Sequence, residues 1–124
     1  MIKLVFALRR HEGMTREEFQ QYWRDEHAPL VKHHAGALRI RRYVQTHTRE
    51  TELDGLVASS RGCEPVVYDG VAELWWDGIE ELVGAYSSEA GQAAGAALLA
   101  DEQKFIDLPR SQIWFGEENV VIGP

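Results

Sequence analysis

The order in which two hydrophobic periodicities follow each other along the chain constrains its fold more than any other feature. Alternating apolar residues predict a strand over residues 2–10, and strand-like patterns also cover residues 38–48, 71–76 and 113–115. Helical spacing predicts a helix that begins at Thr15 and shorter helical segments over residues 79–86 and 88–105. The resulting order, β-α-β-β-α-β, predicts an α+β fold with an antiparallel sheet.

This order is the ferredoxin-like one, and a sheet of this kind packs its helices on one face and leaves the other face in need of a cover. Without an internal repeat or a linker, we expect a single domain over residues 1–124. The expected open face carries more apolar surface than a monomer usually exposes: Val5, Ala7, Val71, Trp75 and Phe115. A second copy of the chain is the simplest cover, so the pattern predicts a homodimer with two sheets face to face.

The first helix carries the clearest local signals. Thr15 and Glu18 have the spacing of a capping box. The stripe predicted to be buried recurs every three to four residues and consists of Phe19, Tyr22, Trp23, His27 and Leu30. Because proline disfavours helical geometry at the residue before it, Pro29 is expected to end or bend the helix at Ala28. His27 would then lie on the buried stripe, in the last helical turn.

Residues 49–68 are polar and contain turn-forming pairs such as Asp54-Gly55. They predict a loop between the second and third strands. A loop of this length in a compact domain is often a lid or a binding loop. We therefore treat this segment as a possible cover for a site.

The charge of the chain excludes one class of partner. The 124 residues include 13 Lys and Arg against 20 Asp and Glu, which gives a net charge of −7. Such an acidic surface repels phosphate backbones, so nucleic acid is a poor partner. Arg39, Arg41 and Arg42 form a local cationic cluster. We expect it to be a solvated strand face or a set of partners for the surplus carboxylates rather than an anion site.

The sequence also indicates where the protein resides. No stretch approaches the roughly 20 apolar residues that a membrane span needs. The first residues lack the three regions of a signal peptide. Cys63 is the single cysteine, so no intramolecular disulfide can form, which fits a reducing compartment. We expect a soluble, cytoplasmic protein without a membrane partner.

Two motifs on neighbouring elements resemble those of a known family. The helix carries Phe19-x-x-Tyr22-Trp23-x-x-x-His27-x-Pro29-Leu30-Val31, and the next strand carries Tyr43-x-Gln45-x-His47. Together with Asp69-Gly70-Val71-Ala72 and with residues 101–107, these motifs resemble EthD-domain proteins over nearly the whole chain. Residues 49–68 are the least typical part.

The resemblance implies a ferredoxin-like protomer in a dimeric α+β barrel, with each pocket between the sheet and the helices. EthD-domain proteins include members tied to ether-degradation gene clusters and to aromatic polyketide tailoring, and muconolactone isomerases are related to them. The resemblance further implies chemistry without a metal or an organic cofactor. Because the family is chemically diverse, its fold does not fix the reaction.

His27 is the first candidate for a catalytic residue. A histidine on an apolar stripe can take up and return a proton near neutral pH. A helix C-terminus favours the imidazolium, whereas burial favours the neutral ring. The alternative is a core histidine whose ring is hydrogen-bonded to a backbone carbonyl. Periodicity alone favours this alternative, and the resemblance favours the catalytic role.

The second strand offers three further candidates on one face. If Tyr43, Gln45 and His47 look towards the helices, they share a pocket with His27. Tyr43 would stabilise an enolate or phenolate oxygen, and Gln45 would orient the substrate. The alternative is a strand-end His47 in solvent and a Tyr43 that belongs to the core.

Aromatic side chains supply the candidate pocket lining, since flat ligands need apolar pockets with a few polar groups. The aromatic candidates for ligand contact are Trp23, Tyr22, Tyr68, Trp76 and Trp114, although each alone is more often simply core. A metal site from His27, His47 and Asp77 is a weak alternative, because zinc needs three or four ligands with recognisable spacing. Cys63 has no base near it in sequence and is treated as incidental.

These observations predict a small cofactor-independent enzyme that moves protons through His27, assisted by His47 and Tyr43. The expected substrate is a flat hydroxylated aromatic, polyketide-like or lactone molecule, and the reaction is a cyclisation, dehydration, decarboxylation or isomerisation. Two alternatives stay open. One is a cofactor-free oxygenase of anthrone-like carbanions, and the other is a non-catalytic dimeric protein that binds ligand or assists a partner oxidase.

Overall fold

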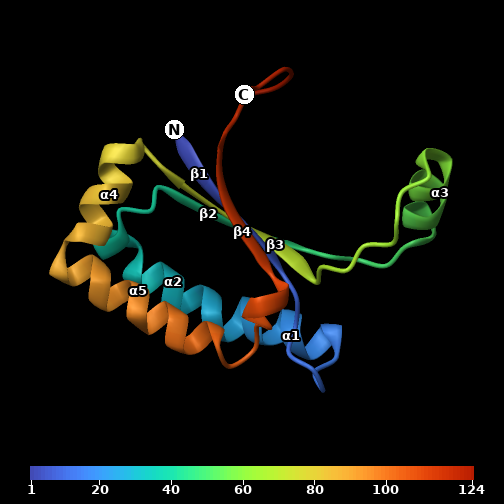
Figure 1. The fold of residues 1–124 in the computed structure, drawn as a ribbon, viewed down its shortest axis with the longest axis horizontal. Helices are drawn as coiled ribbons and strands as arrows, with labels where there is room; N and C mark the ends of the chain where they lie inside the picture. The colour runs from blue at the N-terminus through green and yellow to red at the C-terminus, as the bar shows by residue number, and fades with distance from the viewer.

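The computed structural model describes residues 1–124 and contains one four-stranded antiparallel sheet (Figure 1). The strand order is β2-β3-β1-β4. The strands are β1 (Ile2–Leu8), β2 (Arg42–His47), β3 (Gly70–Trp76) and β4 (Gln112–Glu117). This order, with both central neighbours antiparallel, is ferredoxin-like, and the predicted α+β fold class is confirmed.

Helices cover one face of the sheet (Figure 1). They are α1 (Arg16–Tyr22), a π-helical turn η1 (Trp23–His27), α2 (Ala28–Leu38), α4 (Ile79–Ser87) and α5 (Glu89–Glu102). A short 3₁₀ turn η2 (Leu108–Arg110) precedes β4. The capping box at the start of α1 is present, as the sequence predicts. At the start of α5 the hydroxyl of Ser88 accepts the Gly91 N–H.

The sheet register decides which side chains face the helices. Leu4 of β1 lies opposite Leu74 and Phe115, and cross-strand partners point to the same face. Because Leu4 packs against Leu82 of α4, all three partners lie on the helix side. Phe115, predicted for the open face, therefore lies on the helix face, and Trp114 takes the open one.

The open face is less apolar than the sequence suggests. Trp75 lies on it but is only 6% exposed. Lys3 and Arg42 lie over its ring at 5.3 and 4.9 Å from the ring centroid, and its indole N–H donates to Glu118 at 2.7 Å. Charged side chains thus shield the largest aromatic group of this face.

Of the two outcomes expected at Pro29, an end or a bend of the first helix, the end is not found. The chain passes from α1 through η1 into α2 without leaving helical geometry, and the Ala28 N–H donates to the carbonyl of Trp23, five residues back. Proline has no N–H and its ring crowds the carbonyl four residues before it, so a widened turn accommodates it. His27 consequently lies in the middle of a long helical run and far from a helix C-terminus.

The prediction of a loop over residues 49–68 is wrong for half of the segment. Residues Glu52–Arg61 form α3, which stands away from the rest of the molecule in Figure 1. The Asp54 carboxylate accepts the Thr51 N–H at 2.7 Å, and Gly62 ends the helix with a φ of 66°. Because α3 buries no residue, its sequence carries no apolar stripe that would predict a helix. The residues that indicate this helix are those at its two caps.

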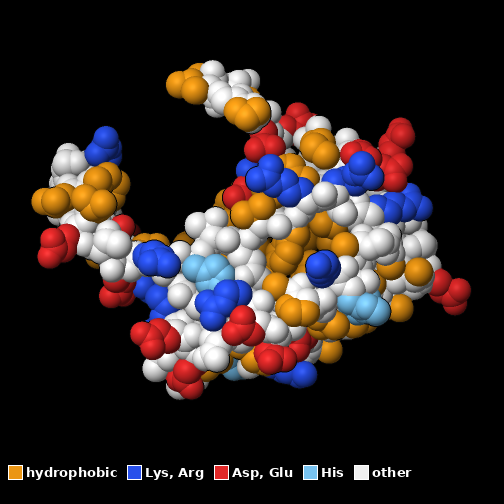
Figure 2. Space-filling model, turned by 180° about the vertical axis from the view of Figure 1, so that it is seen from behind, with side chains coloured by type: hydrophobic (Ala, Val, Ile, Leu, Met, Phe, Trp, Pro, Cys, Tyr) orange, Lys and Arg blue, Asp and Glu red, His pale blue; other side chains and the backbone are white.

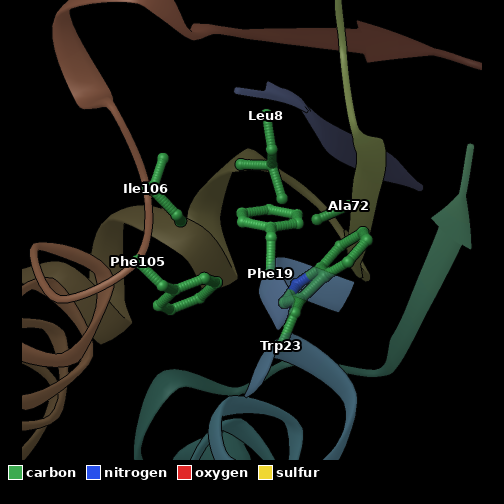
Figure 3. Packing of buried hydrophobic residues seen from close by; sticks show 6 residues of the cluster. All are labelled: Leu8, Phe19, Trp23, Ala72, Phe105 and Ile106. Atoms are coloured by element: carbon green, nitrogen blue, oxygen red, sulfur yellow. The ribbon is translucent and has the colours of Figure 1, made fainter. Parts of the chain in front are cut away.

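The main core lies where η1 meets the sheet (Figure 3). Phe19 and Trp23 have ring centroids 5.7 Å apart, and Phe105 packs on Phe19 at 5.4 Å. Leu8, Ala72 and Ile106 complete the cluster. Trp23 is 1% exposed and fills the space above Gly70, where an added Cβ would lie 2.4 Å from its ring.

Gly70→Ala should lower the free energy of unfolding by about 1 to 3 kcal/mol, because the methyl group has to displace the packed Trp23 ring. The matched control is Gly36→Ala in α2, where an added Cβ meets nothing within 4 Å. This control should raise stability by about 1 kcal/mol through helix propensity. Urea unfolding followed by tryptophan fluorescence measures both. Equal stability of Gly70→Ala and wild type would contradict the close packing of Trp23 on Gly70.

Candidate active site

His27 is tied to a carboxylate on another helix. Its Nδ1 lies 2.7 Å from an oxygen of Asp101, in the last turn of α5. The Tyr22 hydroxyl donates to the other oxygen of Asp101 at 2.6 Å. The widened turn η1 directs both Trp23 and His27 inward, and His27 is 5% exposed, with the Phe105 ring 5.0 Å from its own.

The electrostatics of this pair define a neutral base. Burial disfavours the charge of Asp101, but hydrogen bonds from Tyr22 and His27 outweigh it and lower the pKa of the carboxyl. Burial lowers the pKa of His27, although Asp101 acts in the opposite direction. The imidazole is therefore neutral near pH 7, with its proton on Nδ1 facing the carboxylate. No group of the chain bonds Nε2, whose lone pair is free to accept a proton.

The three candidates on β2 face the helices and are joined to one another. His47 Nε2 lies 2.8 Å from the side-chain oxygen of Gln45, and the Gln45 amide donates to the Tyr43 hydroxyl at 2.8 Å. The same amide donates to the Trp23 carbonyl at 3.0 Å, and the His47 ring packs 4.5 Å from the Trp23 ring. Burial, followed by Arg24 and Arg49, lowers the pKa of His47.

Trp23 thus separates two polar groups. One is the Asp101 group with His27 and Tyr22, and the other is the β2 group of Tyr43, Gln45 and His47. Burial raises the pKa of Tyr43, so its hydroxyl keeps its proton and can donate a hydrogen bond at neutral pH. The structure brings six of the nine predicted site residues into this one region.

A cavity of about 410 Å³ lies between the sheet and α5. The strands and the segment before β2 supply an apolar wall: Leu4, Phe6, Ile40, Leu74, Trp76 and Ile113. The helical wall consists of Tyr86, Gly91, Gln92, Gly95 and Glu102. The cavity reaches the surface beside Tyr86 and Ile113, which are 46% and 56% exposed. A space of this size and lining suits a flat, mostly apolar ligand.

Glu102 is the charged residue of this lining. Burial, together with the neighbouring charge of Asp101, raises its pKa to about 7. Asp101 and Glu102 occupy successive positions of α5. Asp101 points to His27, and Glu102 points to the cavity. Glu102 therefore holds its proton to a much higher pH than an exposed carboxyl does.

The remaining aromatic candidates are dispersed. Trp76 lines the cavity, and its indole N–H donates to the Leu38 carbonyl at 2.7 Å. Tyr68 lies outside the cavity and donates to Gln112. Trp114 lies on the open face opposite Val5 and borders a shallow hollow beside α4. The structure therefore does not gather Tyr68 and Trp114 with the other predicted residues.

Asp101 and Glu102 were absent from the residues predicted to form the site. A signal for them exists in the sequence. Carboxylates are unfavourable in the last turn of a helix, where the dipole is negative, and these two end an otherwise Ala- and Gly-rich segment. Such a costly placement indicates that the rest of the fold uses the charges.

The arginine cluster has the partners that the charge balance predicts. Arg39 pairs with Glu81 at 3.2 Å, and Arg41 pairs with Asp77 at 3.5 Å. Between α2 and β2 lies an apolar hollow bordered by cations, which Figure 2 shows from behind. Arg24 and Lys32 approach it from the helix, and Arg41 from the segment before β2.

Other predicted classes of site find no counterpart in the residue arrangement. No three His, Cys, Asp or Glu side chains gather closely enough to hold a metal ion, so His27, His47 and Asp77 do not form one group. Cys63 is exposed, beyond the end of α3. None of the helices has both the length and the apolar character that a bilayer crossing requires.

Comparison with known proteins places the chain in a family. The EthD domain family matches residues 11–109, so the chain belongs to the EthD family. No match is found among the curated proteins.

Solved structures share the fold. An EthD family protein of Bacillus halodurans C-125 is 22% identical over 96% of this chain and 99% of its own, with a TM-score of 0.64. SnoaB, a cofactor-independent oxygenase from Streptomyces nogalater, is 14% identical over 99% and 97% of the two chains, with a TM-score of 0.55. A dimeric ferredoxin-like protein of unknown function from Thermobifida fusca is 13% identical over 93% and 88%, with a TM-score of 0.55.

Asp101→Asn should lower the pKa of His27 further, because Asp101 is the group that opposes the effect of burial. NMR titration of the imidazole C–H resonances measures this pKa. The control is Asp25→Asn, an exposed carboxylate in the same π turn, which should leave the His27 titration unchanged. A higher His27 pKa in Asp101→Asn would contradict the arrangement.

Proposed function

We propose that the protein is a small cofactor-independent enzyme that transfers protons on a flat hydroxylated aromatic, polyketide-like or lactone substrate. Its acid–base centre is the His27–Asp101 pair, and Tyr43 and His47 assist. The observation that carries this proposal is the buried, neutral imidazole, which Asp101 holds in one tautomer while Nε2 stays unbonded. Paired in this way, a histidine accepts a proton and the adjacent carboxylate stabilises the imidazolium that forms.

The surroundings of the pair support the choice of substrate class. Neither His27 nor Asp101 lines the cavity, but Glu102, the residue after Asp101, does. The cavity has one apolar sheet wall and few polar groups, which favours flat ring systems over sugars or nucleotides. Tyr43 lines the hollow between α2 and β2 rather than this cavity, and its protonated hydroxyl can donate to a substrate oxygen on which negative charge develops there. Isomerisation, cyclisation, dehydration and decarboxylation all need a base next to such a donor.

A cofactor-free oxygenase is the second candidate, and the shared fold with SnoaB, described as a cofactor-independent oxygenase, favours it. A carbanion that forms by proton removal can react with dioxygen directly, so the pocket would need only to bind and deprotonate the substrate. A non-catalytic binding protein would use the same cavity without turnover.

His27→Ala should abolish turnover, whereas His33→Ala, an exposed histidine on α2, should not. The assay incubates each protein with anthrones, linear polyketide mimics and muconolactones, in air and under nitrogen, and identifies the products by mass spectrometry. Loss of a general base lowers rates by about 10² to 10⁴.

The atmosphere separates the candidates. Turnover that requires air would favour the oxygenase, and turnover under nitrogen would favour an isomerase, cyclase, dehydratase or decarboxylase. Tight binding of several compounds without any product would contradict both enzymatic proposals and support the binding protein.

The proposed assembly is a homodimer that packs the open faces of two sheets together. Val5 and Val71 on this face are only partly buried in the single chain, and Trp114 is 48% exposed. A second copy would cover this surface, and a structural neighbour is described as dimeric.

Val71→Asp should convert the dimer into monomers, because a carboxylate in the middle of the contact would be buried without a partner. Analytical ultracentrifugation measures the mass of wild type, this variant and the control Val66→Asp, whose side chain is exposed outside the sheet. A wild type that sediments as a single chain at every concentration would contradict the assembly.

A further inference from the structure

Glu102 differs from every other carboxyl group near the cavity. It is the only Asp, Glu, Lys, Arg or His residue in the lining. The other polar groups of the lining are the Gln92 amide, the Tyr86 hydroxyl and the Trp76 indole N–H. Glu102 forms no hydrogen bond through its side chain, whereas Asp101 beside it accepts two. No side-chain nitrogen or oxygen atom is both fully buried and unpaired, so the Glu102 oxygens remain accessible from the cavity. A ligand in the cavity would therefore meet a carboxyl group that no other side chain already occupies.

The geometry of α5 lets Glu102 face the cavity while Asp101 faces away from it. Successive residues of a helix point about 100° apart, so Asp101 can face His27 and Tyr22 while Glu102 faces the cavity. The hydrogen bonds from Tyr22 and His27 stabilise the negative charge of Asp101. This fixed charge next to Glu102 strengthens the hold of Glu102 on its proton.

We propose that Glu102 is the catalytic residue that touches the ligand in this cavity and exchanges a proton with it, and that the ligand is a flat, mostly apolar cyclic ketone with an acidic C–H beside the carbonyl. This inference rests on the proposed function and deepens it. His27 and Asp101 keep their role as the acid–base centre, and Asp101 in addition acts on Glu102 as a positioning group, because its fixed charge raises the proton affinity of the neighbouring carboxyl.

The reaction balances without another reactant. The Glu102 carboxylate takes the proton from the carbon beside the carbonyl, and the C–H electron pair becomes the C=C bond of an enolate. The carboxylic acid that forms returns the proton either to the enolate oxygen, which gives the enol, or to another carbon of the conjugated system, which gives an isomer. Glu102 ends as the carboxylate that began the cycle. A carboxyl group whose pKa is raised to about 7 serves as base and as acid near neutral pH.

Gly95 provides a way to close the cavity without damaging the helix. It lies in the middle of α5 on the cavity wall, and an added Cβ meets only the Tyr86 ring at 3.9 Å, an ordinary contact. At Gly91, by contrast, a Cβ would lie 1.8 Å from the Ala85 carbonyl oxygen. Gly95→Leu therefore fills the ligand space, and Gly95→Ala is the milder version.

The test uses 2-tetralone, a flat cyclic ketone with an acidic C–H, in deuterated buffer under nitrogen. NMR follows the exchange of its hydrogens for deuterium, and calorimetry measures its binding. Wild type should accelerate the exchange. Glu102→Gln should bind the ketone with little change and exchange it about 100-fold more slowly. Glu89→Gln, an exposed carboxylate at the other end of α5, should behave as wild type. Gly95→Leu should weaken binding by about tenfold or more.

The pH profile tests the positioning role. The exchange rate should rise with pH through the pKa of Glu102, near 7 in wild type. In Asp101→Asn the neighbouring negative charge is gone, so the midpoint should move to lower pH. An Asp101 that is merely structural would lower the rate and leave the midpoint in place.

The outcomes separate this inference from the proposed function. Exchange at the wild-type rate by Glu102→Gln, or wild-type binding by Gly95→Leu, overturns the role of Glu102 while a proton-transfer enzyme stands. A wild type that binds 2-tetralone but exchanges no deuterium overturns the proposed function and the proton transfer together. A wild type that does not bind the ketone overturns the ligand class.

Discussion

The helical run from Arg16 to Leu38 has to accommodate a proline in its middle, and the position of the whole candidate site depends on how it does so. Pro29 cannot donate a backbone hydrogen bond, and the turn before it widens so that the Ala28 N–H reaches the Trp23 carbonyl. Gln45 on β2 donates to the same carbonyl, so the sheet fixes the widened turn from the other side. The result places Trp23 against Gly70 and His27 against Asp101.

At the C-terminal end of α5 the fold stabilises a negative charge that the helix dipole disfavours. Asp101 keeps its charge because a tyrosine hydroxyl and an imidazole N–H replace the water that burial removes. Glu102 has no such donors, and the charge of its neighbour adds to its own desolvation. Two adjacent carboxyl groups therefore differ in their proton affinity, which is how a small site obtains both a fixed charge and a proton carrier.

Most of the fold follows from patterns that short segments carry by themselves. The alternation in β1 and the capping box of α1 predict these elements because their signals lie within a few residues. The errors come from places where distant contacts decide. Phe115 faces the helices because it pairs with Leu4, a register that the three-residue apolar run around it does not encode. The α3 helix was missed because it buries no stripe, although its caps at Thr51 and Gly62 were visible.

The sequence alone determined that this chain forms a ferredoxin-like sheet with helices on one face, that His27 lies on a buried stripe and that Tyr43, Gln45 and His47 share a strand face. These properties depend on periodicity, which is local. Only the tertiary structure decided that His27 meets Asp101 and that Glu102 faces a cavity. These residues are 74 and more positions apart, and their meeting depends on the packing of α5 across the widened turn of the first helical run. No periodicity within either segment carries that information, because it arises where the two surfaces fit.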